Sequence, residues 1–223
     1  MFDWRWDFAF EILPRLLEAT LNTLLAAGIG YLIALVVGLL FALGQRTRYP
    51  TLTAAVREAV EFIRSTPLVL QIFFVFYVAP QFGIRLSPWT AGMIAIGLHY
   101  ASYLSEVYRA GIESIPKGQW EACRALNLSM RRTYSRIIIP QALPAALPGM
   151  GNYLVGIFKD TPMLSVIGVA ELMHVAGALG SETYRYLEPY TLVGVIFLII
   201  SLPTAGGLRR FEAWVKVRLG MTR

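Results

Sequence analysis

Ionisable side chains inside apolar segments are the first residues of this sequence that could do chemistry. His99, Glu106 and Arg109 lie seven and three residues apart in an otherwise apolar stretch, which places them on one face of a helix. An ionisable side chain within a membrane span costs roughly 2.5–3.5 kcal/mol to insert, so it faces protein or a water path. The spacing predicts a Glu106–Arg109 ion pair that fixes the helix, while His99 and Glu106 could instead contribute to a substrate path.

A second polar group interrupts an apolar stretch further along the chain. Asn152 and Lys159 are seven residues apart and share a helical face. Pro162 lacks an N–H and disfavours helical geometry at Thr161, so the sequence predicts a break there. Broken helices at membrane depth often expose backbone groups to a ligand. Lys159 and Asp160 could meet the carboxylate and ammonium of an amino acid, or form an internal salt bridge that holds the break.

These two groups define the candidate substrate path, which consists of His99, Glu106, Asn152, Lys159, Asp160 and Thr161. Elsewhere the sequence lacks catalytic and metal-binding patterns. Cys123 is the single cysteine, and no CxxC or Cys/His spacing offers a metal site. No GxSxG-like or HExxH context accompanies the histidines, and no Walker A loop could cradle nucleotide phosphates. We therefore expect no metal, no cofactor and no enzymatic activity in this chain.

The composition indicates a membrane protein. Of the 223 residues, 56% are hydrophobic and 15% are charged, whereas a soluble domain is about one-quarter charged. Five stretches without charged residues are each long enough to cross about 30 Å of hydrocarbon as helices. We predict an all-α, polytopic membrane helix bundle of about five transmembrane helices, forming one domain over residues 1–223. The predicted spans lie near residues 20–43, 62–83, 88–109, 141–168 and 189–208.

The basic residues predict the orientation of this bundle. Fifteen of the 20 Lys and Arg residues lie in the connections 44–66 and 109–147 and in the C-terminal tail. Because cytoplasmic loops carry an excess of Lys and Arg, these segments are expected in the cytoplasm, with the N-terminus outside. The basic residues thus sort by membrane side and do not form the single patch of a nucleic-acid binder.

Two segments have patterns that predict how they pack. Small residues recur every four positions in the first span, lining one helical face so that another backbone can approach closely. They are Ala26, Gly30, Ala34, Gly38 and Ala42. The sequence leaves open whether the partner helix belongs to this chain. Residues 1–15 alternate aromatic and acidic side chains, and they could lie at the lipid interface or pack as a flap on the bundle.

The segment 105–140 is too long for a bare connection, and its periodicity indicates two short helices with a break near Asn127. Ala122, Ala125 and Leu126 fall on one small apolar face at helical spacing. This face could dock into a groove of a cytoplasmic partner, or pack under its own bundle.

The residues of this segment resemble the cytoplasmic EAA loop of ABC importer permeases, which follows the pattern E-A-A-x3-G-x9-I-x-L-P. The chain has Glu121-Ala122-Cys123, then Asn127 and then Ile137-x-Ile139-Pro140, all at the same spacing. Three positions depart from the pattern, namely Cys123, Asn127 and Ile139. Asn is the residue after Gly that best tolerates a left-handed turn, so the turn between the two helices is expected to remain.

The likeness extends over residues 10–210. Residues 106–122 are similar to the E-x-x-R-x-G-I-x-S-I-x-x-G-Q-x-E-A run of the polar amino-acid subfamily. Pro140-Gln141-Ala142, Gly151-Asn152 and Lys159-Asp160-Thr161 resemble that subfamily's P-Q-A, G-N and K-D-T segments.

This resemblance implies a MetI-like fold of the type I importers and a permease subunit of the cytoplasmic membrane that has no ATPase of its own. Such subunits pair with a second permease, dock on cytoplasmic ABC ATPase subunits and receive the solute from an extracytoplasmic binding protein. The loop at about 113–140 would contain the coupling helix that contacts the ATPase. The implied coupling residues are Gly118, Glu121, Ala122, Cys123, Arg124, Ala125, Leu126 and Asn127. The implied solute is a polar amino acid or a similar compatible solute such as ectoine, and a stand-alone secondary transporter is the alternative.

Overall fold

The computed structural model describes residues 3–218, and every regular element in that range is a helix, which confirms the all-α class. The α-helices are α1 (Trp6–Gly44), α2 (Pro50–Ser65), α3 (Leu68–Phe73), α4 (Pro88–Glu113), α5 (Lys117–Ala125), α6 (Met130–Arg132), α7 (Ile139–Asp160), α8 (Leu172–Thr183) and α9 (Leu187–Arg218). The π-helices Phe74–Val78 and Thr133–Ile138 and the 3₁₀ helices Ala79–Phe82 and Thr161–Ile167 extend them.

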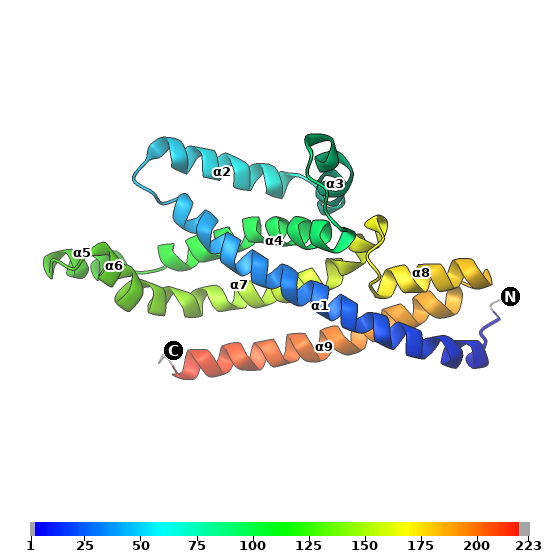
Figure 1. Cartoon of the computed structure of the whole chain (residues 1–223). Coiled ribbons are helices and arrows are strands. Elements are labelled where there is room, and N and C mark those ends of the chain that lie inside the picture. The colour runs from blue at the N-terminus through cyan, green and yellow to red at the C-terminus, as the bar shows by residue number, and fades with distance from the viewer. Residues whose placement is uncertain (1–2, 219–223) are drawn as a thin grey trace.

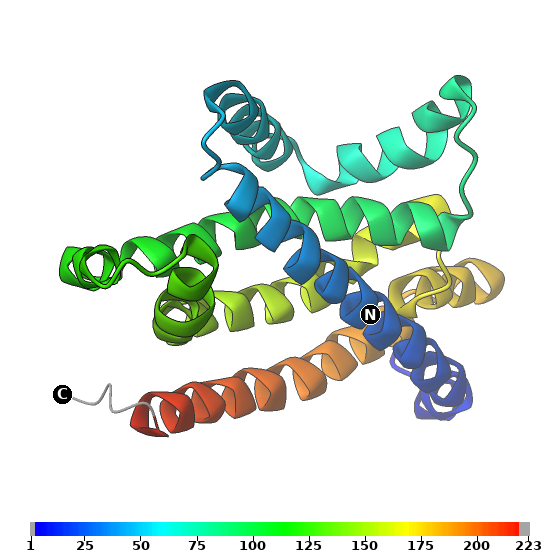
Figure 2. The ribbon, with the colours of Figure 1, turned by 60° about the vertical axis from the view of Figure 1, so that its left-hand side comes forward.

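The long helices form a bundle whose two ends differ. α1 crosses α4 and α7 diagonally, and α9 runs beside α7 (Figure 1 and Figure 2). The short helices α5 and α6 project at one end, where α9 finishes, and α8 lies at the opposite end, where α1 begins (Figure 1). The start of α1 and the end of α9 therefore lie at opposite ends of the bundle (Figure 1).

Helix length and composition mark the segments that can cross a membrane. Two single helices qualify, Trp6–Gly44 and Leu187–Val215, and two bent helix pairs among the described residues also pass when each pair is taken as one span. The pairs are Pro50–Ser65 with Leu68–Phe82, and Met130–Ile167 with Leu172–Thr183. α4, which corresponds to the predicted third span, falls outside this set, but its 26 residues extend about 39 Å at 1.5 Å per residue.

The second predicted span, 62–83, is corrected by the structure because it is not one continuous helix. α2 ends at Ser65, Thr66 is extended with φ −105° and ψ 139°, and the chain restarts after Pro67 at an angle of 107°. The cause is local, since a proline pushes the preceding residue out of the helical region. The interruption predicted at Thr161 is only a change of helix type, because α7 ends at Asp160 and the chain continues directly as a 3₁₀ helix. Thr161 itself keeps right-handed helical angles, with φ −54° and ψ −32°, so the expectation that Pro162 would move it out of the helical region is wrong.

The small-residue stripe of α1 packs against α4 of the same chain. All five of its members are buried. A Cβ placed on Gly30 would lie 2.8 Å from Ile96 Cγ2, and one on Gly38 would lie 2.9 Å from the carbonyl oxygen of Ala101. The stripe therefore allows the two backbones to approach, as predicted, and the partner helix that the sequence left open is α4.

Gly38→Ala should therefore destabilise the protein. The new methyl group would collide with a backbone oxygen that cannot turn away, and overpacking of this kind costs about 1–3 kcal/mol. Gly28→Ala is the matched control on the same helix, because nothing lies within 4 Å of its added Cβ. Thermal unfolding in detergent should show a lower midpoint for Gly38→Ala alone, and equal midpoints would contradict the close packing.

The N-terminal residues pack on the bundle through one face, which is one of the two alternatives that the sequence left open. α1 already begins at Trp6, and Ile12 and Leu16 are buried in a cluster with α8 and α9. Trp6 and Phe10 are each 66% exposed on the other side. One face of this segment thus packs on the bundle, and placement of the other at the lipid interface stays a prediction.

Candidate functional site

The loop at 113–140 forms a short exposed helix, α5, at one end of the bundle (Figure 1). Most of the predicted coupling residues are exposed on it, and Leu126 at its C-cap is 72% exposed. The exposed set is Gly118, Glu121, Ala122, Arg124, Ala125, Leu126 and Asn127. Cys123 is 4% exposed and faces its own chain, so its side chain cannot take part directly in a docking surface. The apolar face expected from periodicity is therefore open and not packed under the bundle.

The inner side of α5 is attached to the membrane helices by side-chain packing. Trp120 meets Tyr134 edge-to-face, with ring centroids 5.5 Å apart. Ile115, just before α5, belongs to a buried cluster with Ile138 and Ala142. This cluster joins the segment before α5 to the start of α7 by packed side chains.

Asn127 closes α5 in the left-handed conformation that the sequence predicts, with φ +52°. The N–H of Leu128 donates to the carbonyl of Cys123 at 3.0 Å, and the N–H of Asn127 donates to that of Arg124 at 2.9 Å. These two bonds form a Schellman motif, which satisfies the last carbonyls of the helix. Asn127 thus sets the angle at which the chain leaves the exposed helix.

Glu106 is placed in an ion-pair network near the α5 end of α4. Arg109 contacts Glu106 at 2.6 Å and Glu113 at 2.9 Å, and Arg46 approaches Glu113 at 3.7 Å. The predicted Glu106–Arg109 pair is thus present, and through Arg46 the network ties α4 to the connection that follows α1. Glu106 does not line the polar cavity described next.

A polar cavity of about 530 Å³ lies between α4 and α7. His99 on α4 and Asn152 and Asp160 on α7 line it, which brings three of the predicted substrate-path residues together. Tyr100 donates a hydrogen bond from its hydroxyl to Asp160 Oδ2 at 2.7 Å. The wall also contains Tyr103 and Tyr153, whose rings are tilted at a centroid distance of 5.5 Å. A carboxylate surrounded by tyrosine rings favours a ligand that carries a positive charge.

Lys159 and Thr161 lie elsewhere. Lys159 lines a neighbouring cavity of about 500 Å³ together with Asn152, Arg209 and Glu212. No Lys159–Asp160 ion pair occurs within residues 3–218, so the internal salt bridge considered for this break is not formed. Thr161 is buried and donates from its hydroxyl to the carbonyl of Phe158 at 2.8 Å, which stabilises the start of the 3₁₀ turn.

Sequence patterns did not single out Gln71, which contacts the cavity wall from outside. Its Oε1 lies 3.2 Å from Nδ1 of His99. The available signal was a lone amide in the apolar run after Pro67. Among the residues that the structure describes, no three His, Cys, Asp or Glu side chains form a group that could hold a metal ion.

The fold and the exposed loop define the membrane-spanning part of a transporter, and comparison with known proteins agrees. Residues 34–217 match the model of the binding-protein-dependent transport system inner membrane component family. The chain belongs to this family and is a multi-pass inner-membrane permease subunit of an ABC importer.

Individual relatives are similar over nearly the whole chain. The probable amino-acid ABC transporter permease protein y4tG of Sinorhizobium fredii is 42% identical, covering 94% of both chains. The glutamine transport system permease protein GlnP of Escherichia coli K12 is 34% identical, covering 95% of this chain and 98% of GlnP. Both relatives are transport permeases by name.

Solved structures confirm the expected permease fold. The crystal structure of an amino acid ABC transporter with histidines matches with a TM-score of 0.88 at 30% identity, covering 95% of this chain and 99% of the other. The inward-facing MetNI methionine ABC transporter matches with a TM-score of 0.70 at 18% identity, covering 95% and 99%, which is a likeness of fold alone.

Proposed function

We propose that this permease moves a polar amino acid or a similar compatible solute, such as ectoine, into the cell at the expense of ATP hydrolysed by a separate subunit. The names of its relatives, which include an L-cystine and a glutamine transport permease, support this solute class. Its partners would be a second permease subunit, cytoplasmic ABC ATPase subunits and an extracytoplasmic solute-binding protein. The chain itself would need no cofactor.

The observation that carries this proposal is the exposed α5 with Leu126 at its end. An apolar side chain that is 72% exposed, next to Ala122 and Ala125 and flanked by Glu121 and Arg124, suits insertion into a groove with a polar rim. We assign the surface formed by these five residues to the contact with the ATPase and name it the docking surface.

Closure of the ATPase pair on ATP would displace α5, and the packing described above gives the route into the membrane. The Trp120–Tyr134 contact and the Ile115–Ile138 cluster couple α5 to the start of α7. α7 then carries the displacement along its length to Asp160 at its other end. A rigid helix that joins the docking surface to the cavity wall can switch access to the cavity between the two sides of the membrane.

The solute would be recognised in the cavity between α4 and α7. An amino acid carries an ammonium group, for which the Asp160 carboxylate and the tyrosine rings are complementary. The carboxylate of the amino acid would pair with Lys159 and Arg209, which line the neighbouring cavity together with Asn152. The ammonium group and the carboxylate of the solute would thus bind in two adjacent cavities that share Asn152 as a wall residue.

We also propose that the α5 end is cytoplasmic and the N-terminus lies outside. Arg124 belongs to α5 and Arg131 and Arg132 to α6, the two helices at the end of the bundle where α9 finishes (Figure 1). Arg209 and Arg210 lie in the last third of α9, and this distribution agrees with the excess of Lys and Arg in cytoplasmic loops. Protease removal of an N-terminal tag from right-side-out vesicles tests this orientation, and full protection of the tag would reverse it.

Uptake by proteoliposomes tests the function itself. Vesicles with the permease, its ATPase subunit and its binding protein should accumulate a labelled polar amino acid or ectoine only when ATP is enclosed with the ATPase. A Walker A lysine variant of the ATPase should reduce uptake to background. Uptake that persists in this variant and follows an ion gradient would favour a stand-alone secondary transporter instead.

A further inference from the structure

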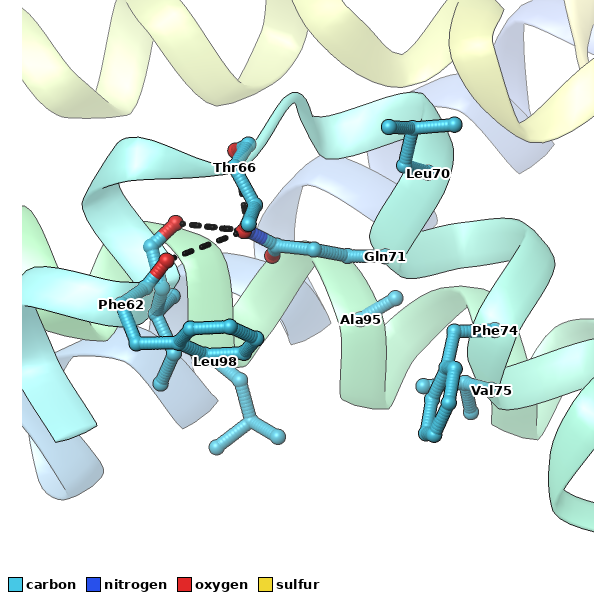
Figure 3. A pocket seen from close by; sticks show the side chains of 9 residues that line it. Phe62, Thr66, Leu70, Gln71, Phe74, Val75, Ala95 and Leu98 are labelled. Atoms are coloured by element: carbon cyan, nitrogen blue, oxygen red, sulfur yellow. Dashed lines mark hydrogen bonds between the residues drawn. The ribbon is translucent and has the colours of Figure 1, made fainter.

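Gln71 stands between the α2–α3 elbow and the polar cavity. It lies in the first turn of α3, directly after the 107° bend, and its side chain reaches back to the end of α2 beside Thr66 (Figure 3). The amide nitrogen Nε2 is 2.7 Å from the carbonyl oxygen of Ile63, 3.1 Å from that of Thr66 and 2.7 Å from Thr66 Oγ1. On its other side, Oε1 faces His99.

These contacts allow only one orientation of the Gln71 amide. Two of the three groups around Nε2 are carbonyl oxygens, which only accept hydrogen bonds. The third, the Thr66 hydroxyl, directs its own hydrogen to the carbonyls of Phe62 and Ile63. A flipped amide would bring an oxygen within 2.7 Å of another carbonyl oxygen. The nitrogen therefore faces the elbow, and the oxygen faces His99.

The fixed amide in turn determines which nitrogen of His99 carries a proton. Gln71 Oε1 can only accept, so the 3.2 Å contact requires that His99 Nδ1 carries the hydrogen. A neutral imidazole protonated at Nδ1 has a free lone pair at Nε2. His99 lines the polar cavity, and within the described part of the chain Nε2 makes no hydrogen bond.

We propose that Gln71 is a positioning residue, which holds neutral His99 in the Nδ1-protonated tautomer so that Nε2 offers an acceptor to an N–H group of the solute. The step to the solute rests on the proposed function, because it assumes that the solute enters this cavity. The tautomer itself follows from the described contacts alone. Together with Asp160, His99 gives the cavity two acceptors, which match the N–H donors of an ammonium group.

A merely structural role for Gln71 makes a different prediction from a positioning role. The same amide also stabilises the bend between α2 and α3 through its hydrogen bonds to the end of α2. This bend lies beside an apolar cavity of about 290 Å³ lined by Phe62, Leu70 and Phe74 (Figure 3). Gln71→Leu removes both the hydrogen bonds to the end of α2 and the acceptor for His99. Gln71→Glu has the same shape and keeps an acceptor for His99, but it places a carboxylate against the carbonyls of Ile63 and Thr66. A structural role thus makes Glu at least as damaging as Leu, whereas a positioning role makes Glu the milder change.

Nitrogen NMR of histidine can read the tautomer directly. The chain has two histidines, so His174→Gln leaves His99 as the single labelled residue in lipid-embedded permease. At about pH 8.5, well above the ordinary imidazole pKa, we expect the hydrogen on Nδ1 in this background and with Gln71→Glu. With Gln71→Leu it should move substantially to Nε2. A hydrogen on Nε2 in the parent protein, or on Nδ1 despite Gln71→Leu, would overturn the proposal.

Uptake by the complete complex tests the consequence for the solute. With a mixture of radiolabelled polar L-amino acids and ectoine, Gln71→Leu should lower ATP-dependent uptake about tenfold, which corresponds to one lost hydrogen bond. Gln71→Glu should stay within about twofold of the parent. Equal losses in both variants, or none in Gln71→Leu, would refute a positioning role. If the parent complex transports nothing but His99 keeps its hydrogen on Nδ1, the proposed function fails and the Gln71–His99 contact does not.

Discussion

Leu126→Asp should detach the permease from its ATPase subunit. The side chain is 72% exposed and packs little against its own chain, so the substitution should leave the fold intact. In the complex it would lose a buried leucine and place a carboxylate in an apolar groove. The first effect alone is worth about 1.5–3 kcal/mol, and together they should weaken binding by at least about a hundredfold.

Co-purification of the ATPase with tagged permease measures this effect. Leu126→Met is the matched control, because it nearly conserves volume and apolarity and should retain the ATPase. Both variants should elute from size exclusion as the parent does. Retention of the ATPase by Leu126→Asp at parental yield would show that the docking surface lies elsewhere.

Asn127→Val should uncouple ATP hydrolysis from transport, whereas Asn127→Gly should behave like the parent. Position 127 has φ +52°, which glycine adopts freely, asparagine tolerates and a β-branched residue adopts only with strain of about 1–3 kcal/mol. Valine would therefore open the Schellman turn and change the angle between α5 and the residues after it. The ratio of solute transported to ATP hydrolysed should fall several-fold with valine only.

The comparison of these two substitutions isolates the turn, because neither keeps the asparagine side chain. If valine and glycine lower the ratio equally, the asparagine side chain itself matters and not the left-handed backbone. If neither lowers it, the geometry of the turn is irrelevant to coupling.

Local features of the fold could be predicted from the sequence because they depend on neighbours along the chain. The small residues of α1, the turn at Asn127 and the end of α7 at Asp160 each rest on helical period or on the conformational preferences of one or two residues. Pro67 carried an equally local signal for the elbow. It was outweighed by the apolar character of residues 62–83, because hydrophobicity measures whether a segment prefers lipid and not whether it is straight.

Contacts between distant residues could not be predicted. Asp160 pairs with Tyr100, 60 positions earlier, and not with the adjacent Lys159. Successive residues of a helix point about 100° apart, so Lys159 and Asp160 reach different cavities. Likewise, the stripe on α1 showed that a helix packs there but not which one, since that depends on the tertiary arrangement.

Cross-linking from α5 tests most directly whether this helix is the contact through which ATP hydrolysis drives the permease. Cys123→Ala removes the single cysteine, and Ala125→Cys then places a unique thiol on the docking surface. With a short bifunctional reagent in membranes that contain the complex, we expect a product of permease and ATPase whose yield changes when ATP is bound. A thiol at residue 125 that reaches only its own chain or no protein, in a complex that still transports, would contradict this mechanism.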